Sequence, residues 1–383
     1  MFTANYPFYM PGNPALLSTP ERVGADANYT GRGVVMAFID SGFYPHPELA
    51  ERVLVHVDAS TVAIQEEPGD AFAAHDLSWH GQMTSVIAAG DGHLSEGKYR
   101  GIASEAQLVL IRVSTPRGHI KEADILRGLN WLALHHARFG VRVVNISVGG
   151  DYVSHDAKHP LYAVVRKLTR AGITVVCAAG NRGHAELLPP ASAAEAITVG
   201  GVDDQNSLDS PLWRSYHHNH GLDYTGKPKP DLIAPAVWVA GPIMPETSVA
   251  REARWLGPIL QAKSDKHMLR LLQKGYSDLG IAHEQVLQAD SHLHSMLQAR
   301  INTHKIVDAH HQHVDGTSVA APIVAAVVAQ MLEANPDLTP RQIRTILCAT
   351  AQPLADVPAQ QQGAGVLRAG DAVALAAQKR VKA

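Results

Sequence analysis

The chain has 383 residues, of which 46% are hydrophobic and 18% charged, and only two are cysteines. This composition predicts a globular protein with a large core, and it excludes both a disordered chain and a disulfide-stapled one. The formal net charge of -3 at pH 7 gives no basic field that would attract nucleic acid or an anionic membrane, so we expect neither partner.

The first residues show no pattern typical of a targeting signal. MFTANYPFYMPGNP lacks a cationic stretch followed by an apolar run, and the chain contains no 18 uninterrupted apolar residues. Cys177 and Cys348 each lie in an apolar run, where a small buried side chain is expected. These features predict a cytoplasmic protein without a membrane span.

Short apolar runs bounded by glycine and proline are typical of buried strands. They cover residues 34–39, 106–113, 141–148, 173–179 and 196–202. Amphipathic or apolar segments of helical length cover residues 121–138, 157–171, 318–334 and 340–350. Because strands and helices alternate, the sequence predicts a parallel sheet that is covered on both faces.

Residues 245–310 break this alternation, because they contain no strand-like run. Apolar residues recur there at helical spacing: Leu269, Leu272, Tyr276 and Leu279. A second helical pattern covers about 283–302, so we expect a helical hairpin packed on the main domain. Both ends of this insertion must return near the start of the predicted helix 318–334. We therefore expect it either to form a rim or lid beside a site there or only to add stability.

Three segments each place a reactive side chain beside glycine at the edge of a predicted element. Asp40 ends the strand VVMAFID, at the carboxyl end where open α/β sheets place their sites. His80 opens an apolar helix, and Ser318 lies in the first turn of another, where the helix dipole favours an anionic intermediate. A serine nucleophile needs a base and a carboxylate that orients the base, and these three residues supply that set.

A fourth segment, VVCAAGNRG, places Asn181 just after a predicted strand. The side-chain amide of an asparagine can donate a hydrogen bond to the oxyanion of a tetrahedral intermediate. Asn181 is therefore a candidate oxyanion donor.

The sequence resembles the subtilases, the serine proteases of peptidase family S8, through IDSGFYPHPEL, HGQMTSVIAAG, NISVGG, AAGN and GTSVAAP in that order. The resemblance covers most of the chain. It divides the chain into an N-terminal extension, 1–20, and a catalytic domain, 21–383, with the insertion at about 245–310. It implies a doubly wound α/β fold with a mainly parallel central sheet and helices on both faces.

The resemblance also implies a serine endopeptidase that cleaves extended polypeptides through an acyl-enzyme and needs no organic cofactor. Asp40 would orient His80, His80 would act as the base, Ser318 would attack, and Asn181 would bind the oxyanion. The substrate-binding residues implied are Ser147, Val148 and Gly149, as an edge that pairs with the substrate, and Ala178, Ala179 and Gly180, as the wall of the S1 pocket. Such a wall of small residues favours a large apolar side chain before the scissile bond.

Some alternatives stay open at this point. One is a peptide-maturation protease of narrow specificity, or a transpeptidase, and another is an inactive homologue that only binds peptides. Gln82, Ala321, Ile323 and the turn PLWRSYHHNHG depart from the family pattern, which bears on fine specificity more than on catalysis. By resemblance to intracellular subtilisins, NYPFYMPGNP is a candidate segment to occupy the cleft. The sequence leaves the oligomeric state open.

The 22 histidines invite a metal-site interpretation. They cluster in HHNH (217–220), His292 with His294, and HHQH (310–313), at spacings compatible with zinc. No cysteine or tight carboxylate set completes a site, so we interpret them as surface or packing residues and predict no metal site. Many subtilases bind calcium, but the loop DGHLSEGKYR has few acidic residues, and calcium is left without an assigned site.

Overall fold

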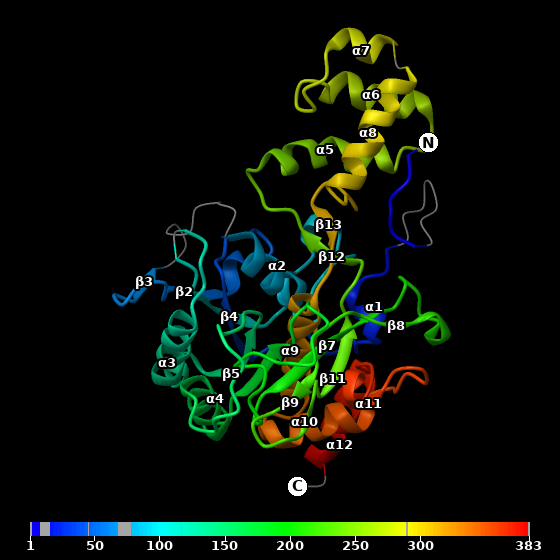
Figure 1. The fold of residues 1–383 in the computed structure, drawn as a ribbon. Helices are drawn as coiled ribbons and strands as arrows, with labels where there is room; N and C mark the ends of the chain where they lie inside the picture. The colour runs from blue at the N-terminus through cyan, green and yellow to red at the C-terminus, as the bar shows by residue number, and fades with distance from the viewer. Residues whose placement is uncertain are drawn as a thin grey trace.

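The computed structural model describes residues 2–7, 16–44, 46–67, 78–115, 117–288 and 290–381. A sheet with helices on both sides forms the main body, and a group of helices projects from it (Figure 1). The N-terminal segment lies beside this projection, and the last helix lies at the opposite end of the molecule.

The central sheet of the described chain has nine strands, in the order β11-β7-β6-β5-β1-β4-β2-β3 with β8 beside β7. Neighbouring strands from β11 to β2 pair in parallel, and only β3 and β8 pair antiparallel with their neighbours. The strands are β1 (Val35–Asp40), β2 (Val53–Asp58), β3 (Gln65–Glu67), β4 (Gln107–Arg112), β5 (Val141–Ile146), β6 (Thr174–Ala178), β7 (Ile197–Asp203), β8 (Arg214–Ser215) and β11 (Leu232–Pro235).

Helices cover both faces of this sheet. In β1, Met36 and Phe38 face a core formed with α2, α9, α10 and α12, whereas Ala37 and Ile39 face a second core formed with α3 and α4. Successive side chains of a strand point to opposite faces, and both faces of β1 are fully buried. The helices are α2 (Ser78–Ala89), α3 (Glu122–Phe139), α4 (Pro160–Arg170), α9 (Thr317–Ala334), α10 (Pro340–Thr350) and α12 (Ala369–Val381). The predicted fold class is confirmed.

The predicted elements of the main domain agree with the structure to within a few residues. The largest difference is in α4, predicted over 157–171, which begins only at Pro160 because His159 caps it. The predicted cap of α10 is present, since Thr339 and Gln342 form a capping box. Cys177 is buried, Cys348 is half-buried, and both are free thiols.

The helix α9 is long and apolar enough to cross a membrane, but 89% of it is buried within the protein. Its apolar character is explained by its place in the core, between the sheet and α2 and α12.

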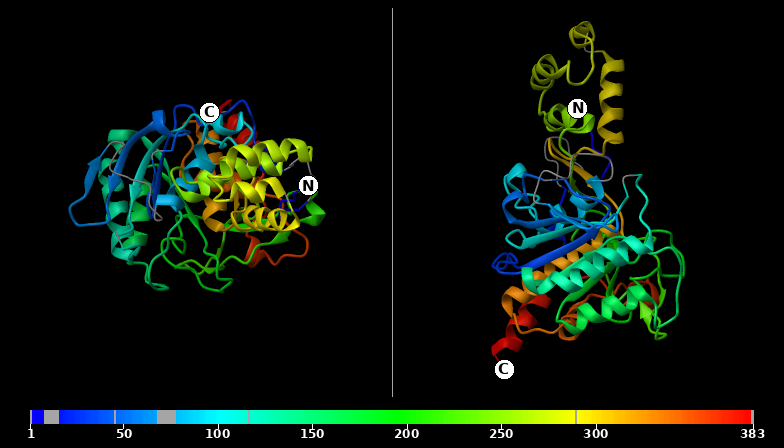
Figure 2. Two further views of the ribbon diagram at one scale, coloured as in Figure 1. Left: turned by 90° about the horizontal axis from the view of Figure 1, so that it is seen from above. Right: turned by 90° about the vertical axis from the view of Figure 1, so that its left-hand side faces the viewer.

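The insertion is more complex than predicted. Its described residues form four helices, α5 (Ser248–Leu260), α6 (Asp265–Gly275), α7 (His283–Gln288) and α8 (Ser291–Thr303). The expected two-helix hairpin is wrong, because α5 was not foreseen and because Asp290 caps a new helix within the range 283–302. These helices share a hydrophobic core of their own and stand away from the sheet in Figure 1 and in the right view of Figure 2, so we call residues 243–310 the helical projection.

A two-stranded antiparallel hairpin joins the helical projection to the main domain. Its strands are β12 (Val239–Pro242) and β13 (His311–Val314). Since β13 ends four residues before Ser318, the connection leads directly into α9. The remaining elements are α1 (Thr19–Val23), α11 (Ala359–Gln362), the paired strands β9 (Gly221–Leu222) and β10 (Pro228–Lys229), and the short 3-10 helices η1 (Ala50–Arg52), η2 (His93–Ser95) and η3 (Ser210–Leu212).

Candidate active site

Asp40 and His80 form a close pair at the carboxyl end of β1. The Nδ1 of His80 donates to Oδ1 of Asp40 at 2.6 Å, and the Asp40 side chain is fully buried. Oδ1 also accepts from the backbone N–H of Ser41 at 2.7 Å, and Oδ2 accepts from the Thr84 hydroxyl at 3.1 Å. Asp40 is therefore held from three directions and in turn fixes the ring of His80.

The environment of His80 favours its protonated form. Burial lowers the pKa of His80, but the charge and hydrogen bond of Asp40 outweigh burial, so the pKa is raised above its ordinary value. The His80 side chain is still 29% exposed, which leaves it accessible to a substrate.

Gly81 lets the helix that carries His80 approach the strand that carries Asp40. A Cβ at this position would lie 2.1 Å from the Gly42 carbonyl oxygen and 2.9 Å from the Phe43 ring. Only glycine fits there, because no side chain tolerates such contacts with backbone. The glycine after His80 is thus a condition for the Asp40–His80 contact.

Asn181 is oriented by the residue that precedes Ser318. Thr317 donates to Oδ1 of Asn181 from its backbone N–H at 2.8 Å and from its hydroxyl at 2.9 Å. Both contacts use Oδ1, and Nδ2 makes no hydrogen bond within the described part of the chain. The Nδ2 hydrogens therefore remain available to a substrate oxygen.

A cavity of about 240 Å³ joins Ser318 and Asn181 to the predicted substrate-binding residues. Every one of those residues lines it: Ser147, Val148, Gly149, Ala178, Ala179 and Gly180. None of the residues described for the helical projection contributes to this lining, so the projection is not a wall of this cavity.

Sequence reasoning missed part of the cavity wall. Arg182, His184 and Glu186 line the cavity beside the small residues, together with the buried Asn219. The wall is therefore more polar than a row of alanines and glycine suggests. Thr84 and Thr317 were missed as well, although Thr317 stands in the Gly-Thr-Ser motif that was used to find Ser318.

The segment proposed to occupy the cleft, NYPFYMPGNP, lies only partly within the described residues. Asn5 contacts Nε2 of His313 at 2.7 Å, Tyr6 is buried near Val307, and the carbonyl of Pro7 accepts from Asn206 at 3.0 Å. These contacts place residues 5–7 against the base of the helical projection, and none of the three is with a residue that lines the cavity. Residues 8–14 of the segment fall outside the described residues.

The histidine clusters make specific packing contacts. His218 accepts from the backbone N–H of Gly201 through Nδ1, and its Nε2 lies 2.6 Å from the carbonyl of Gln361. His311 pairs with Asp308 at 2.9 Å, and His294 stacks on Phe2. These contacts agree with their interpretation as packing residues.

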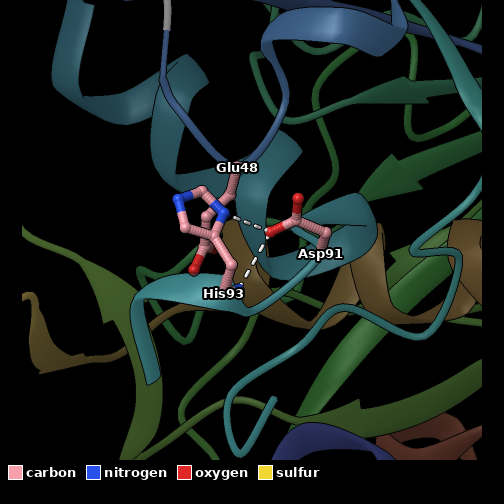
Figure 3. Close-up of side chains that lie close together, drawn as sticks. All are labelled: Glu48, Asp91 and His93. Atoms are coloured by element: carbon pink, nitrogen blue, oxygen red, sulfur yellow. Dashed lines mark hydrogen bonds and ion pairs between the residues drawn. The ribbon is translucent and has the colours of Figure 1, made fainter. Parts of the chain in front are cut away.

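A different group of possible metal ligands lies between the loop after β1 and the loop after α2. Figure 3 shows Glu48, Asp91 and His93 side by side, and their ligand atoms all lie within 4.8 Å of one another. Nδ1 of His93 contacts Oδ1 of Asp91 at 2.8 Å, and Glu48 Oε1 accepts from the N–H of Leu94 at 3.1 Å. Glu48 is buried, and its Oε2 has no hydrogen-bond partner among the described residues.

Comparison with known proteins identifies the family of this chain. A model of the subtilase family matches residues 31–366. The chain therefore belongs to the subtilase family, which confirms the resemblance and the enzyme class of serine protease.

Individual relatives agree with this assignment. The chain is 29% identical to the serine protease AprX of Bacillus subtilis (strain 168), over 90% of this chain and 67% of that protein. It is 31% identical to Subtilisin Savinase of Lederbergia lenta, over 47% of this chain and 60% of that protein. Fervidolysin of Fervidobacterium pennivorans has the same fold, with a TM-score of 0.63 at 17% identity, over 98% of this chain and 51% of that chain. The chain thus covers between about half and two thirds of these relatives.

Proposed function

We propose that the protein is a serine endopeptidase that hydrolyses extended polypeptide segments through an acyl-enzyme intermediate, with Asp40, His80 and Ser318 as its triad. The contact of 2.6 Å between His80 and the buried Asp40 carries this proposal, because it fixes one tautomer of His80 and leaves Nε2 as the base. Ser318 stands at the start of α9, in the wall of the cavity that contains Asn181.

In the first step, Nε2 of His80 takes the Ser318 proton while Oγ attacks the scissile carbonyl carbon. Asp40 stabilises the imidazolium that forms. Nδ2 of Asn181 and the N-terminal end of α9 stabilise the oxyanion. His80 then gives its proton to the leaving amine. Water repeats the sequence on the acyl-enzyme, with His80 again as base, and releases the second product.

The substrate would bind as an added strand along Ser147, Val148 and Gly149, and its side chain before the scissile bond would enter the cavity behind Ala178, Ala179 and Gly180. The charged residues Arg182 and Glu186 at this cavity favour a narrower preference than a purely apolar pocket would give.

One experiment separates this proposal from its alternatives. The purified protein and its Ser318→Ala variant are incubated with a fluorophosphonate probe and with casein. Labelling and cleavage that both require Ser318 support a general protease. Labelling without casein cleavage indicates a processing enzyme or a transpeptidase of narrow specificity. Absence of labelling in the folded protein contradicts the triad and indicates a peptide-binding homologue.

We also propose that a divalent cation such as calcium, which many subtilases bind, would be held by Glu48 and Asp91. The fit rests on the buried carboxylate of Glu48, which has a ligand oxygen within 4.8 Å of one of Asp91 and whose Oε2 has no hydrogen-bond partner among the described residues. The cation would supply only structural stabilisation, since this cluster contains none of the triad residues. No organic cofactor, nucleic acid or membrane is required by this function, and the cytoplasmic location stays a prediction.

A further inference from the structure

Asn219 lies behind the proposed oxyanion donor, in the loop between β8 and β9. It belongs to the HHNH run and is only 6% exposed, although it lines the cavity. A buried asparagine needs partners for its amide, and among the described residues the hydrogen-bond partners of Asn219 all lie in the segment that carries Asn181.

Asn219 forms hydrogen bonds with residues on both sides of Asn181 in the sequence. Its Oδ1 accepts from the backbone N–H of Arg182 at 2.9 Å and from that of His184 at 3.4 Å. Its own backbone N–H donates to the carbonyl of Gly180 at 2.9 Å. The residue before Asn181 and the residue after it are therefore both held by the same asparagine.

Gly180 shows how closely this loop is fitted to Asn219. Its φ is +102°, a conformation that residues with a side chain rarely adopt. A Cβ on Gly180 would lie 2.9 Å from Nδ2 of Asn219. The amide of Asn219 thus occupies the space that the missing side chain leaves.

We propose that Asn219 is a positioning residue for the oxyanion hole. It fixes the backbone of residues 180–184, while Thr317 fixes the side-chain oxygen of Asn181. Together they aim Nδ2 of Asn181 at the carbonyl oxygen of the substrate. This inference rests on the proposed role of Asn181. It also gives a function to the turn HHNHG, one of the departures from the family pattern.

If Asn219 positions the oxyanion donor, its substitution changes kcat, whereas a purely structural role of Asn219 would change only the stability of the fold. An oxyanion donor stabilises the transition state more than the bound substrate, so a misdirected donor lowers kcat and leaves KM almost unchanged. We expect Asn219→Ala to lower kcat by about tenfold or more, since small misplacements of catalytic groups are costly.

The test is a double-mutant cycle on a short peptide p-nitroanilide. Kinetics are measured for wild type, Asn181→Ala, Asn219→Ala and the double variant. If Asn219 acts through Asn181, its substitution lowers kcat less than about twofold once Asn181 is already alanine. An equal loss in both backgrounds, or an unchanged kcat in Asn219→Ala, overturns the inference.

Asn335 offers a matched control. It is also buried, accepts from the N–H of Asp337 at 3.2 Å and donates to the carbonyl of Ala376 at 3.1 Å, but it does not line the cavity. Asn335→Ala should lower the melting temperature without lowering kcat. If Asn219→Ala does not fold, Asn219→Ser is used with the same expectation. An Asn181→Ala variant with wild-type kcat would refute the proposed oxyanion role itself, and the inference would fall with it.

Discussion

The hydroxyl of Thr84 donates to Oδ2 of Asp40 at 3.1 Å, on the side of the carboxylate that His80 does not use. The side chains of Thr84 and Asp40 are both fully buried. Thr84 lies one helical turn after His80 in α2, so one helix supplies both the base and a second donor to the carboxylate that orients it.

We expect Thr84→Val to destabilise the protein by about 1–3 kcal/mol, because Oδ2 of a buried carboxylate would lose a donor. Valine keeps the shape of threonine, so the packing term is small. The change should appear in urea unfolding monitored by circular dichroism. Thr345→Val is the control, since that hydroxyl is on the exposed side of α10 and bonds only its own helix. Equal stability of the Thr84 variant and wild type would contradict the contact.

Asp40→Asn should lower kcat by about 10⁴-fold, the size of effect known for this change in Ser-His-Asp triads. It should also move the pH dependence. The pKa of His80 is raised by Asp40, and only neutral His80 can act as base, so wild-type kcat/KM rises as the pH passes this raised pKa. In the variant the rise should occur at lower pH. A pH–rate profile that keeps its midpoint would show that Asp40 does not set this pKa.

The raised pKa of His80 also makes the stability of the fold depend on pH. Because the folded-state pKa of His80 is raised, the Asp40–His80 pair stabilises the fold fully below the unfolded-state pKa of about 6.5 and loses this contribution as the pH rises through the folded-state pKa. The difference in melting temperature between wild type and Asp40→Asn should therefore narrow with rising pH.

Glu48→Gln tests the proposed cation site. Burial raises the pKa of Glu48, so the buried carboxylate without a cation disfavours its charged form. Calcium should raise the melting temperature of the wild-type protein and have little effect on Glu48→Gln. With a chelator present, the variant should be at least as stable as wild type. An equal calcium response in both proteins would place the cation elsewhere.

Gln298→Ala should release the N-terminal segment from the helical projection. The side-chain amide of Gln298 accepts from the N–H of Thr3 at 2.9 Å and donates to its carbonyl at 2.6 Å, and Phe2 is buried in the core of the projection. Without this pair of bonds, amide hydrogen exchange in residues 2–7 should accelerate severalfold, as expected when about 0.5–1.5 kcal/mol per hydrogen bond is lost. Gln285→Ala in α7 serves as control, because the Gln285 side chain accepts locally from the N–H of Ala282 and makes no described contact with the N-terminal segment.

Sequence reasoning predicted the positions of residues best where the sequence marks an element boundary locally. Asp40, His80 and Ser318 each stand at an element boundary marked by glycine, and the structure places each at the predicted boundary. The contacts of Asn219 with Arg182 and His184, and of Glu48 with Leu94, join segments far apart in the chain. No periodicity or spacing marks such contacts before the fold is known.

The prediction of a two-helix hairpin for the insertion was wrong for a local reason. The sequence analysis assigned no helix to residues 248–260, and the structure forms α5 there with Pro258 near its end. Asp290 was read within a continuous helical pattern, although its side chain accepts from the N–H of Leu293 and starts α8. An asparagine or aspartate in such a pattern competes as a cap, and the pattern alone does not decide which wins.

The hairpin of β12 and β13 leaves the main sheet intact and carries at its tip a unit with its own hydrophobic core. For protein engineering, this hairpin is therefore a site at which one inserted module can be exchanged for another. A change in the inserted module can reach the nucleophile, because β13 continues through Asp315 into the helix that carries Ser318. A sensor domain grafted in place of residues 243–310 would be connected to Ser318 by the seven residues 311–317, so the hairpin is a site at which ligand binding can be coupled to proteolysis.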